Sequence, residues 1–171
     1  MVFKKKYSWV SIFLLISFIA CGYRFGGNGK LPNNATSIHV NVFENLTGET
    51  GIENVITNDL IYEFTRSKDI DVTNSDEAEA FLTGIVKSVR TETIAQKGRN
   101  TSLSRRVFVL VDLELTDQND RVLWSVKDVP ENETYNVASE ETAINPGRRV
   151  AINRLSKRLA EKIFNQLTDD F

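Results

Sequence analysis

The sequence has few of the residues from which most catalytic and metal sites are built. Its 171 residues include one cysteine, Cys21, and one histidine, His39. Neither an intramolecular disulfide nor a metal site made of several Cys or His ligands is possible with this composition. No phosphate-binding loop and no dinucleotide-binding glycine motif is present. With a single histidine near the N-terminus, no Ser-His-Asp or Cys-His set is predicted. We therefore expect a protein that is not an enzyme, with no catalytic residue, no metal and no cofactor.

Long apolar segments and an excess of positive charge are also missing. The apolar run at 7–20 has fourteen residues, fewer than the roughly 20 that a membrane-spanning helix needs. The net charge is −2, and it becomes −5 without residues 1–20, which carry three lysines and no acid. Binding to nucleic acid is not expected, because it requires clustered positive charge. The composition, 41% hydrophobic and 26% charged, is typical of one globular domain.

Residues 1–20 have the basic start and short apolar run of a secretory signal peptide. The segment ends in Phe18-Ile19-Ala20-Cys21, which resembles the bacterial lipobox, where a small residue precedes a cysteine that is acylated before cleavage. The alternative is a plain signal peptide followed by an unrelated cysteine. A lipid on the sulfur protects the single thiol of an exported chain from oxidation. We therefore expect Cys21 to be the lipidated first residue of the mature protein.

Residues 21–36 are predicted to form a lipidated tether. The segment is rich in glycine, contains Pro32 and shows no apolar period. Gly22 follows the cysteine, and by resemblance to the sorting rule of bacterial lipoproteins this favours the outer membrane over the inner membrane. The domain organisation is therefore a signal peptide at 1–20, the tether at 21–36 and a single domain at 37–171.

The apolar periodicity of residues 37–171 predicts an α+β domain. Spacings of three and four residues predict one helix that begins with a capping box of Thr50 and Glu53, and a second helix that begins at Pro146. We expect Pro130 to end the last strand and 131–143 to be irregular. The predicted architecture is a two-layer sandwich, with two helices on one face of a mixed, mostly antiparallel sheet of four to five strands. The expected strands lie near 38–42, 70–72, 80–95, 103–116 and 121–129.

The segment 103–116 alternates most clearly between apolar and other residues. Its predicted buried row is Val107, Val109, Val111, Leu113 and Leu115. Phe108 and Leu110 point away from that row, among charged neighbours, and apolar residues in such a position indicate a candidate contact surface. The alternative is a second, minor burial under a loop.

Four segments of the chain form a recognisable set: CGYRF at 21–25, FENLT at 43–47, GIE at 51–53 with TNDL at 57–60, and DQNDRVLW at 117–124. They resemble the LptE family, the lipopolysaccharide-assembly lipoproteins of the outer membrane, and the match in order and length spans 21–167. The resemblance implies a lipid-anchored domain on the periplasmic side of the outer membrane. It implies a plug that sits inside the LptD β-barrel, assists barrel assembly and passes lipopolysaccharide to the outer leaflet.

Four basic residues lie near the expected hairpin connection of this acidic chain: Lys97, Arg99, Arg105 and Arg106. Arginine binds phosphate through two parallel hydrogen bonds. Together with Phe108 and Leu110, the cluster is our candidate contact for lipid A phosphates or for carboxylates of the barrel. The alternative is a solvated hairpin tip.

Two other functions remain open on the sequence. An activator of a cell-wall synthase needs a long tether, and the segment before residue 35 spans at most about 45 Å when fully extended. A subunit of a lipoprotein secretion pore needs membrane-spanning strands of about ten alternating residues. The segment 103–116 is long enough, but Arg106, Asp112 and Glu114 make its second face a poor lipid surface.

Overall fold

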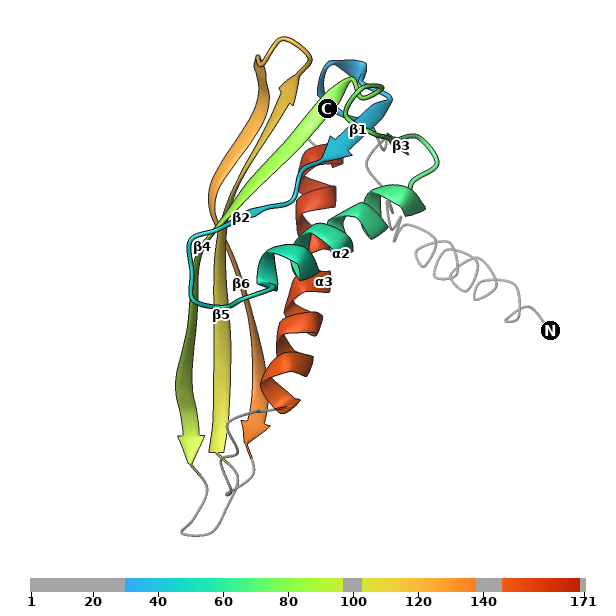
Figure 1. Cartoon of the computed structure of the whole chain (residues 1–171). Coiled ribbons are helices and arrows are strands. Elements are labelled where there is room, and N and C mark those ends of the chain that lie inside the picture. Colours follow the sequence, from blue (N-terminus) through green and yellow to red (C-terminus); the bar gives the residue numbers. More distant parts are fainter. Residues whose placement is uncertain (1–29, 97–102, 138–145, 170–171) are drawn as a thin grey trace, which may run out of the picture.

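The computed structural model describes residues 30–96, 103–137 and 146–169 (Figure 1). The signal peptide, Cys21, Lys97 and Arg99 lie outside these residues. In chain order the described elements are the 3-10 helix η1 (Pro32–Asn34), β1 (Ser37–Val40), β2 (Glu44–Asn45), α2 (Ile52–Arg66), β3 (Asp71–Val72), β4 (Ala80–Gln96), β5 (Leu103–Asp117), β6 (Val122–Val137) and α3 (Pro146–Asp169).

The strands form one mixed sheet in the order β3-β1-β4-β5-β6, with β2 also paired to β4. β1 is parallel to β3 and β4, and β2 is parallel to β4, whereas the β4–β5 and β5–β6 pairs are antiparallel. α2 lies in the connection between the parallel strands β1 and β3, as a βαβ crossover requires. The expected α+β class is confirmed, and the sheet has six strands where four to five were predicted.

Both helices cover the same face of the sheet, as expected (Figure 1). Each helix turns one apolar stripe inward, and these side chains meet the apolar row of β5 to form the core. The rings of Phe64 on α2 and Phe164 on α3 pack edge to face with centroids 5.3 Å apart, a favoured aromatic geometry. The apolar helix residues with 0% exposure include Ile56, Leu60 and Phe64 on α2, and Leu155, Leu159, Ile163 and Leu167 on α3.

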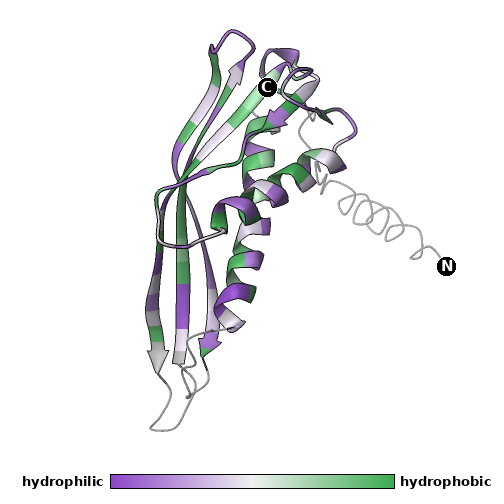
Figure 2. Ribbon diagram, in the orientation of Figure 1, coloured by the Kyte–Doolittle hydropathy of each residue, from purple (hydrophilic) through white to green (hydrophobic). Residues whose placement is uncertain are grey.

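Apolar and polar residues interleave along the long strands (Figure 2). All five residues of the row predicted on β5, from Val107 to Leu115, are buried. Burial of an aliphatic side chain stabilises the fold by about 1.5–3 kcal/mol relative to exposure. The alternation of β5 therefore fixes which face of the sheet meets the helices. No helix among the described residues is long and apolar enough to span a membrane.

The prediction that Pro130 ends a strand is wrong, because β6 continues through it to Val137. Pro130 lies opposite Leu110 on an edge strand, and its carbonyl oxygen accepts a hydrogen bond from Lys162 Nζ at 2.9 Å on the side away from β5. A β residue turns its N–H and C=O to the same side, so the missing N–H of proline removes no bond between β6 and β5.

Three smaller expectations also need correction. The predicted tether ends earlier than 36, because Leu31 and Pro32 are buried, with 1% exposure for Leu31. Thr50 does not cap α2; the N-cap residue is Gly51 at φ +90°, a left-handed conformation that glycine adopts without strain. Along the predicted strand 121–129, Val122, Trp124 and Val126 alternate in the pattern of a buried row, but Val122 is 55% exposed and the other two are half-buried.

Candidate functional site

The sheet has a second face that the two helices do not cover (Figure 1). We call this the outer face and define it by the residues of β5 that alternate with the buried row, together with their cross-strand neighbours. On β5 these are Arg106, Phe108, Leu110, Asp112 and Glu114. Opposite them lie Glu92, Arg90, Ser88, Ile85 and Thr83 of β4, and Thr134, Asn132, Pro130 and Ser125 of β6.

Phe108 and Leu110 are half-buried on the outer face, so their predicted direction is confirmed. The guanidinium of Arg90 lies over the ring of Phe108, 4.7 Å from its centroid, in a cation–π arrangement. Arg90 Nε is also 3.7 Å from Glu92 Oε1 on the same strand. A cationic side chain thus shields one side of the phenyl ring and leaves a mixed apolar and charged surface.

The basic cluster predicted at the hairpin is split by the strand geometry. Arg105 and Arg106 are neighbours in β5, so their side chains point to opposite faces. Arg106 belongs to the outer face, where its Nε donates a hydrogen bond of 3.1 Å to Thr134 Oγ1. Arg105 shares the face of Val107. Of the four basic residues, the described part of the chain places only Arg106 beside Phe108 and Leu110.

An ion-pair cluster that sequence analysis missed lies in the middle of the outer face. Lys87 Nζ is 3.2 Å from Asp112 Oδ2 and 2.7 Å from Asp128 Oδ1. The backbone N–H of Asp128 donates to Asp112 Oδ1 at 2.7 Å, and this bond, followed by that from Lys87, lowers the pKa of the Asp112 carboxyl. The carboxylates of Asp128 and then Asp112 raise the pKa of the Lys87 ammonium.

The cluster exists because two irregularities of the sheet lie side by side. The register shifts between Val86 and Ser88 on β4, and again on β6 opposite the step from Val111 to Leu113. Asp112 lies between Val111 and Leu113 on β5, and Asp128 on β6 has a φ of +57°. Bulges are not visible in an alternating pattern, so only the acidic Asp112 within the apolar run 107–113 hinted at this site.

A shallow pocket of about 300 Å³ lies beside the cluster on the outer face. Its lining includes Thr83, Ile85, Asp112 and Lys127. The described residues contain no group of three or more His, Cys, Asp or Glu side chains placed to hold a metal ion. The arrangement suits contact with a surface of mixed charge and apolar character.

The segment FENLT at 43–47 shapes the connection from β1 to α2. Asn45 Nδ2 donates to the carbonyl oxygen of Glu49 and to Glu53 Oε2, both at 2.8 Å. Asn45 Oδ1 accepts hydrogen bonds from the N–H and the hydroxyl of Thr47, at 2.9 and 2.7 Å. Glu53 Oε2 also accepts the N–H of Gly51 at 3.1 Å. These bonds satisfy the polar groups of the turn and the first turn of the helix.

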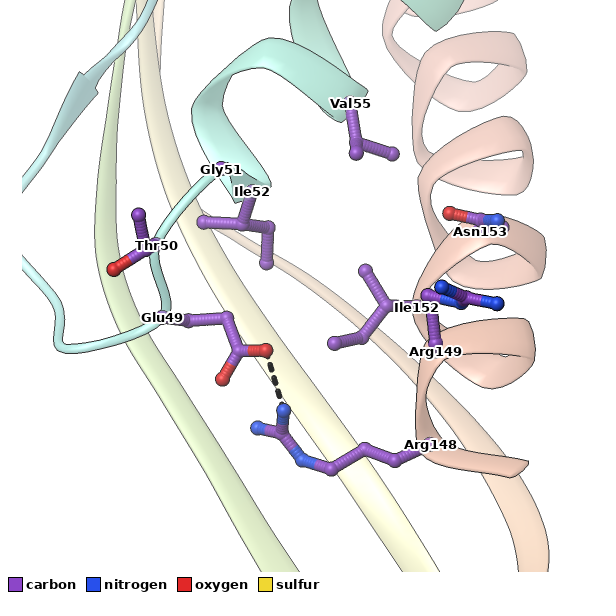
Figure 3. Close-up of a pocket in the computed structure, with 9 residues that line it drawn as sticks. All are labelled: Glu49, Thr50, Gly51, Ile52, Val55, Arg148, Arg149, Ile152 and Asn153. Atoms are coloured by element: carbon purple, nitrogen blue, oxygen red, sulfur yellow. Dashed lines mark hydrogen bonds and ion pairs between the residues drawn. The ribbon is translucent and has the colours of Figure 1, made fainter. Parts of the chain in front are cut away.

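The same connection is attached to α3 at a pocket of about 430 Å³ (Figure 3). There the guanidinium of Arg148 forms an ion pair with the carboxylate of Glu49. The carboxylate of Glu49 is the main cause that raises the pKa of Arg148. Figure 3 also shows Arg149 and Asn153 on α3, on the far side of Ile152 from α2. The ion pair joins the starts of the two helices.

Comparison with known families decides the identity of the chain. The family model for LptE, lipopolysaccharide-assembly, matches residues 35–167. This chain belongs to the LptE family. The resemblance stated from the sequence is thereby confirmed, and the LptE match covers every described strand and both helices apart from the last two residues of α3. The chain is thus a member of a family of lipopolysaccharide-assembly lipoproteins.

Among the similar solved structures, one with a TM-score above 0.5 has the same fold. The solution structure of lipoprotein B from Nitrosomonas europaea is 16% identical, with a TM-score of 0.53 over 84% of this chain and 88% of that chain. A lipoprotein from Caulobacter crescentus is 17% identical, with a TM-score of 0.49 over 74% and 88%. The PelC dodecamer from Paraburkholderia phytofirmans is 17% identical, with a TM-score of 0.45 over 84% and 95%. No curated protein sequence matches the chain.

Proposed function

We propose that this chain is an outer-membrane lipoprotein that plugs the LptD β-barrel, assists its assembly and contacts lipopolysaccharide during insertion into the outer leaflet. The observation that carries the proposal is the LptE family match over residues 35–167. A binding role is consistent with two features of the described residues: they contain no cluster of metal ligands, and the helices leave one long face of the sheet uncovered. The role is that of a binding partner without catalytic activity.

The outer face supplies a surface of suitable chemistry for both contacts. Phe108 and Leu110 offer apolar area, and the guanidinium groups of Arg90 and Arg106 lie next to them. Lipopolysaccharide combines phosphates with acyl chains, and the inner wall of a barrel is lined with polar side chains. Arginine beside apolar side chains fits either partner, because it binds phosphate or carboxylate through parallel hydrogen bonds.

We propose that the domain is held on the periplasmic side of the outer membrane by lipid on Cys21. One acyl chain gives only marginal binding, and two or more hold a protein stably. Mass analysis of the mature protein tests this directly. We expect an acylated Cys21 as the first residue, and release of the Cys21→Ser protein into the soluble fraction. An unmodified thiol on the mature chain contradicts the anchor.

Photocrosslinking from a single position tests the partners. A photoreactive amino acid at Asn132, exposed on the outer face opposite Phe108, reports on that face. The same residue at Asn153, exposed on α3, is the matched control. In intact cells we expect Asn132 to give adducts with a large β-barrel or with lipopolysaccharide, and Asn153 to give fewer.

The identity of the adduct separates the candidate functions. An adduct with LptD supports the plug, whereas an adduct with a cell-wall synthase supports the activator. A ring-shaped oligomer of the extracted lipoprotein on size-exclusion chromatography supports the secretion pore. Recovery of neither barrel nor lipopolysaccharide from position 132 contradicts the proposal.

A further inference from the structure

Half of β4 forms a free edge of the sheet. On the side away from β5, β1 pairs with Ala80–Leu82 and β2 pairs with Ile85 and Val86. From Lys87 to the end of β4 at Gln96, no described strand lies on that side (Figure 1). A strand in this position presents unpaired N–H and C=O groups, which are a template for pairing with another strand.

The opposite edge of the sheet is guarded. On β6, Pro130 contributes no N–H, and its carbonyl oxygen accepts a hydrogen bond from Lys162 of α3. The carbonyl oxygen of Asn132 accepts one from the guanidinium of Arg158, which also pairs with Glu133 at 2.6 Å. Cationic side chains of α3 thus occupy two backbone carbonyls of β6. Proline and charged side chains of this kind are devices that prevent pairing between edges.

Among the described residues, the free edge of β4 has no proline and no helix side chain bonded to its carbonyls, and its register irregularities lie at the ends of the segment 88–94, between Val86 and Ser88 and between Thr93 and Ala95. The segment 88–94 reads Ser-Val-Arg-Thr-Glu-Thr-Ile, with no proline or glycine and with β-branched residues at four of its positions, a composition that favours strands. Thr91, Glu92, Thr93 and Ile94 are all exposed, Ile94 to 43%. This edge is therefore available for a partner strand.

We propose that two copies of this chain pair antiparallel through the edge 88–94, with Thr91 opposite Thr91 of the partner subunit. This register places Arg90 opposite the partner's Glu92, and by symmetry Glu92 opposite the partner's Arg90. Both are exposed side chains of one face, already 3.7 Å apart within a chain. Opposite charges directly across a strand pair stabilise it, and like charges destabilise it.

The charges also select this register over its neighbours. Centring the pair on residue 90 or on residue 92 places two arginines or two glutamates opposite each other. The self-complementary arrangement is what a two-fold symmetric interface requires, since one patch must meet its own copy. The inference goes beyond the proposed function: it describes a state of the free lipoprotein, in which a second copy covers the free edge of β4, whereas side chains of α3 cover the edge of β6.

Cysteine crosslinking of the full-length lipoprotein in detergent tests the pairing. Thr91→Cys treated with a short bismaleimide is expected to give a covalent dimer, because the two thiols face each other. Ser125→Cys, exposed on β6 and on the guarded edge of the sheet, is the matched control and is expected to remain monomeric. The wild-type chain, whose single cysteine is Cys21, sets the background.

Charge exchange in the Thr91→Cys protein tests the register. Arg90→Glu or Glu92→Arg alone places two like pairs across the interface and is expected to lower the dimer yield about tenfold. The double exchange restores both pairs and is expected to restore the yield, with circular dichroism showing that all variants are folded. Equal crosslinking from position 125, no rescue by the double exchange, or a Thr91→Cys adduct with a different protein overturns the proposal.

Discussion

The ring of Phe43 lies directly against the backbone of Gly84, in the space that a Cβ atom at position 84 would occupy. Phe43 comes from the connection after β1 and is almost fully buried, and Gly84 is in the first half of β4. A glycine inside a strand often marks a place where another group approaches the backbone closely, and the structure shows such an approach here. The missing side chain lets the FENLT segment pack on the sheet.

We expect Gly84→Ala to destabilise the protein by about 1–3 kcal/mol, because the added methyl group overlaps a buried ring and forces it to move. Urea denaturation measures the loss. Gly48→Ala is the matched control, since nothing lies within 4 Å of a Cβ atom there. Equal stability of the two variants contradicts the role assigned to the Phe43 contact.

Acid sensitivity of the outer face follows from Asp112. Its pKa is lowered by the N–H of Asp128 and then by Lys87. A carboxyl with a lower pKa in the folded state contributes stability above its unfolded pKa, about 3.9, and loses it as the pH falls through the folded pKa. We expect Asp112→Asn to lower stability at neutral pH and to flatten the stability profile below about pH 4.

Urea denaturation at a series of pH values checks the Asp112 prediction. Glu114→Gln is the control, because Glu114 is an exposed carboxylate on the same face of the same strand. If both variants keep the acid slope of the parent protein, the cluster around Asp112 does not contribute as described.

The guard on β6 predicts an effect on association. Arg158→Ala combined with Lys162→Ala removes the groups that bind the carbonyls of Asn132 and Pro130. We expect new edge pairing, seen as concentration-dependent light scattering, with a change in unfolding free energy of no more than about 1 kcal/mol per exposed pair. Lys157→Ala, an exposed cation of the same helix, should leave scattering unchanged.

The split of the basic cluster separates Arg105 from Arg106 in lipopolysaccharide binding. We expect Arg106→Glu to weaken binding about tenfold, because it replaces a cationic hydrogen-bond donor on the outer face with a carboxylate that repels phosphate. Arg105→Glu, on the other face, should have a smaller effect. Binding assays with purified lipopolysaccharide measure both, and equal losses would place the contact elsewhere.

Periodicity predicted the elements whose pattern is regular. The buried row of β5 recurs at every second residue from Val107 to Leu115, and the buried residues of α3 from Leu155 to Leu167 recur at spacings of three and four, so the strand face and the helix were both predicted correctly. The family segments predicted the fold family. Residues that are buried at regular intervals recur at the same intervals in the sequence, so their elements can be predicted from it.

The remainder depended on tertiary context. Pro130 stops a central strand but not an edge strand, and the position of β6 in the sheet is not encoded near Pro130. The cluster of Lys87, Asp112 and Asp128 joins three strands across two bulges, so no local pattern reveals it. Arg105 and Arg106 are adjacent in sequence, and only the pleat separates them.

The ion pair of Glu49 with Arg148 joins residues 99 positions apart. Contacts of such long sequence separation form late, because a large loop must close first. α3 follows every described strand along the chain, so a chain synthesised only as far as β6 has no helix over β5 and β6 and cannot complete its interior. The apolar row of β5 must therefore wait for α3 before it is fully shielded from water.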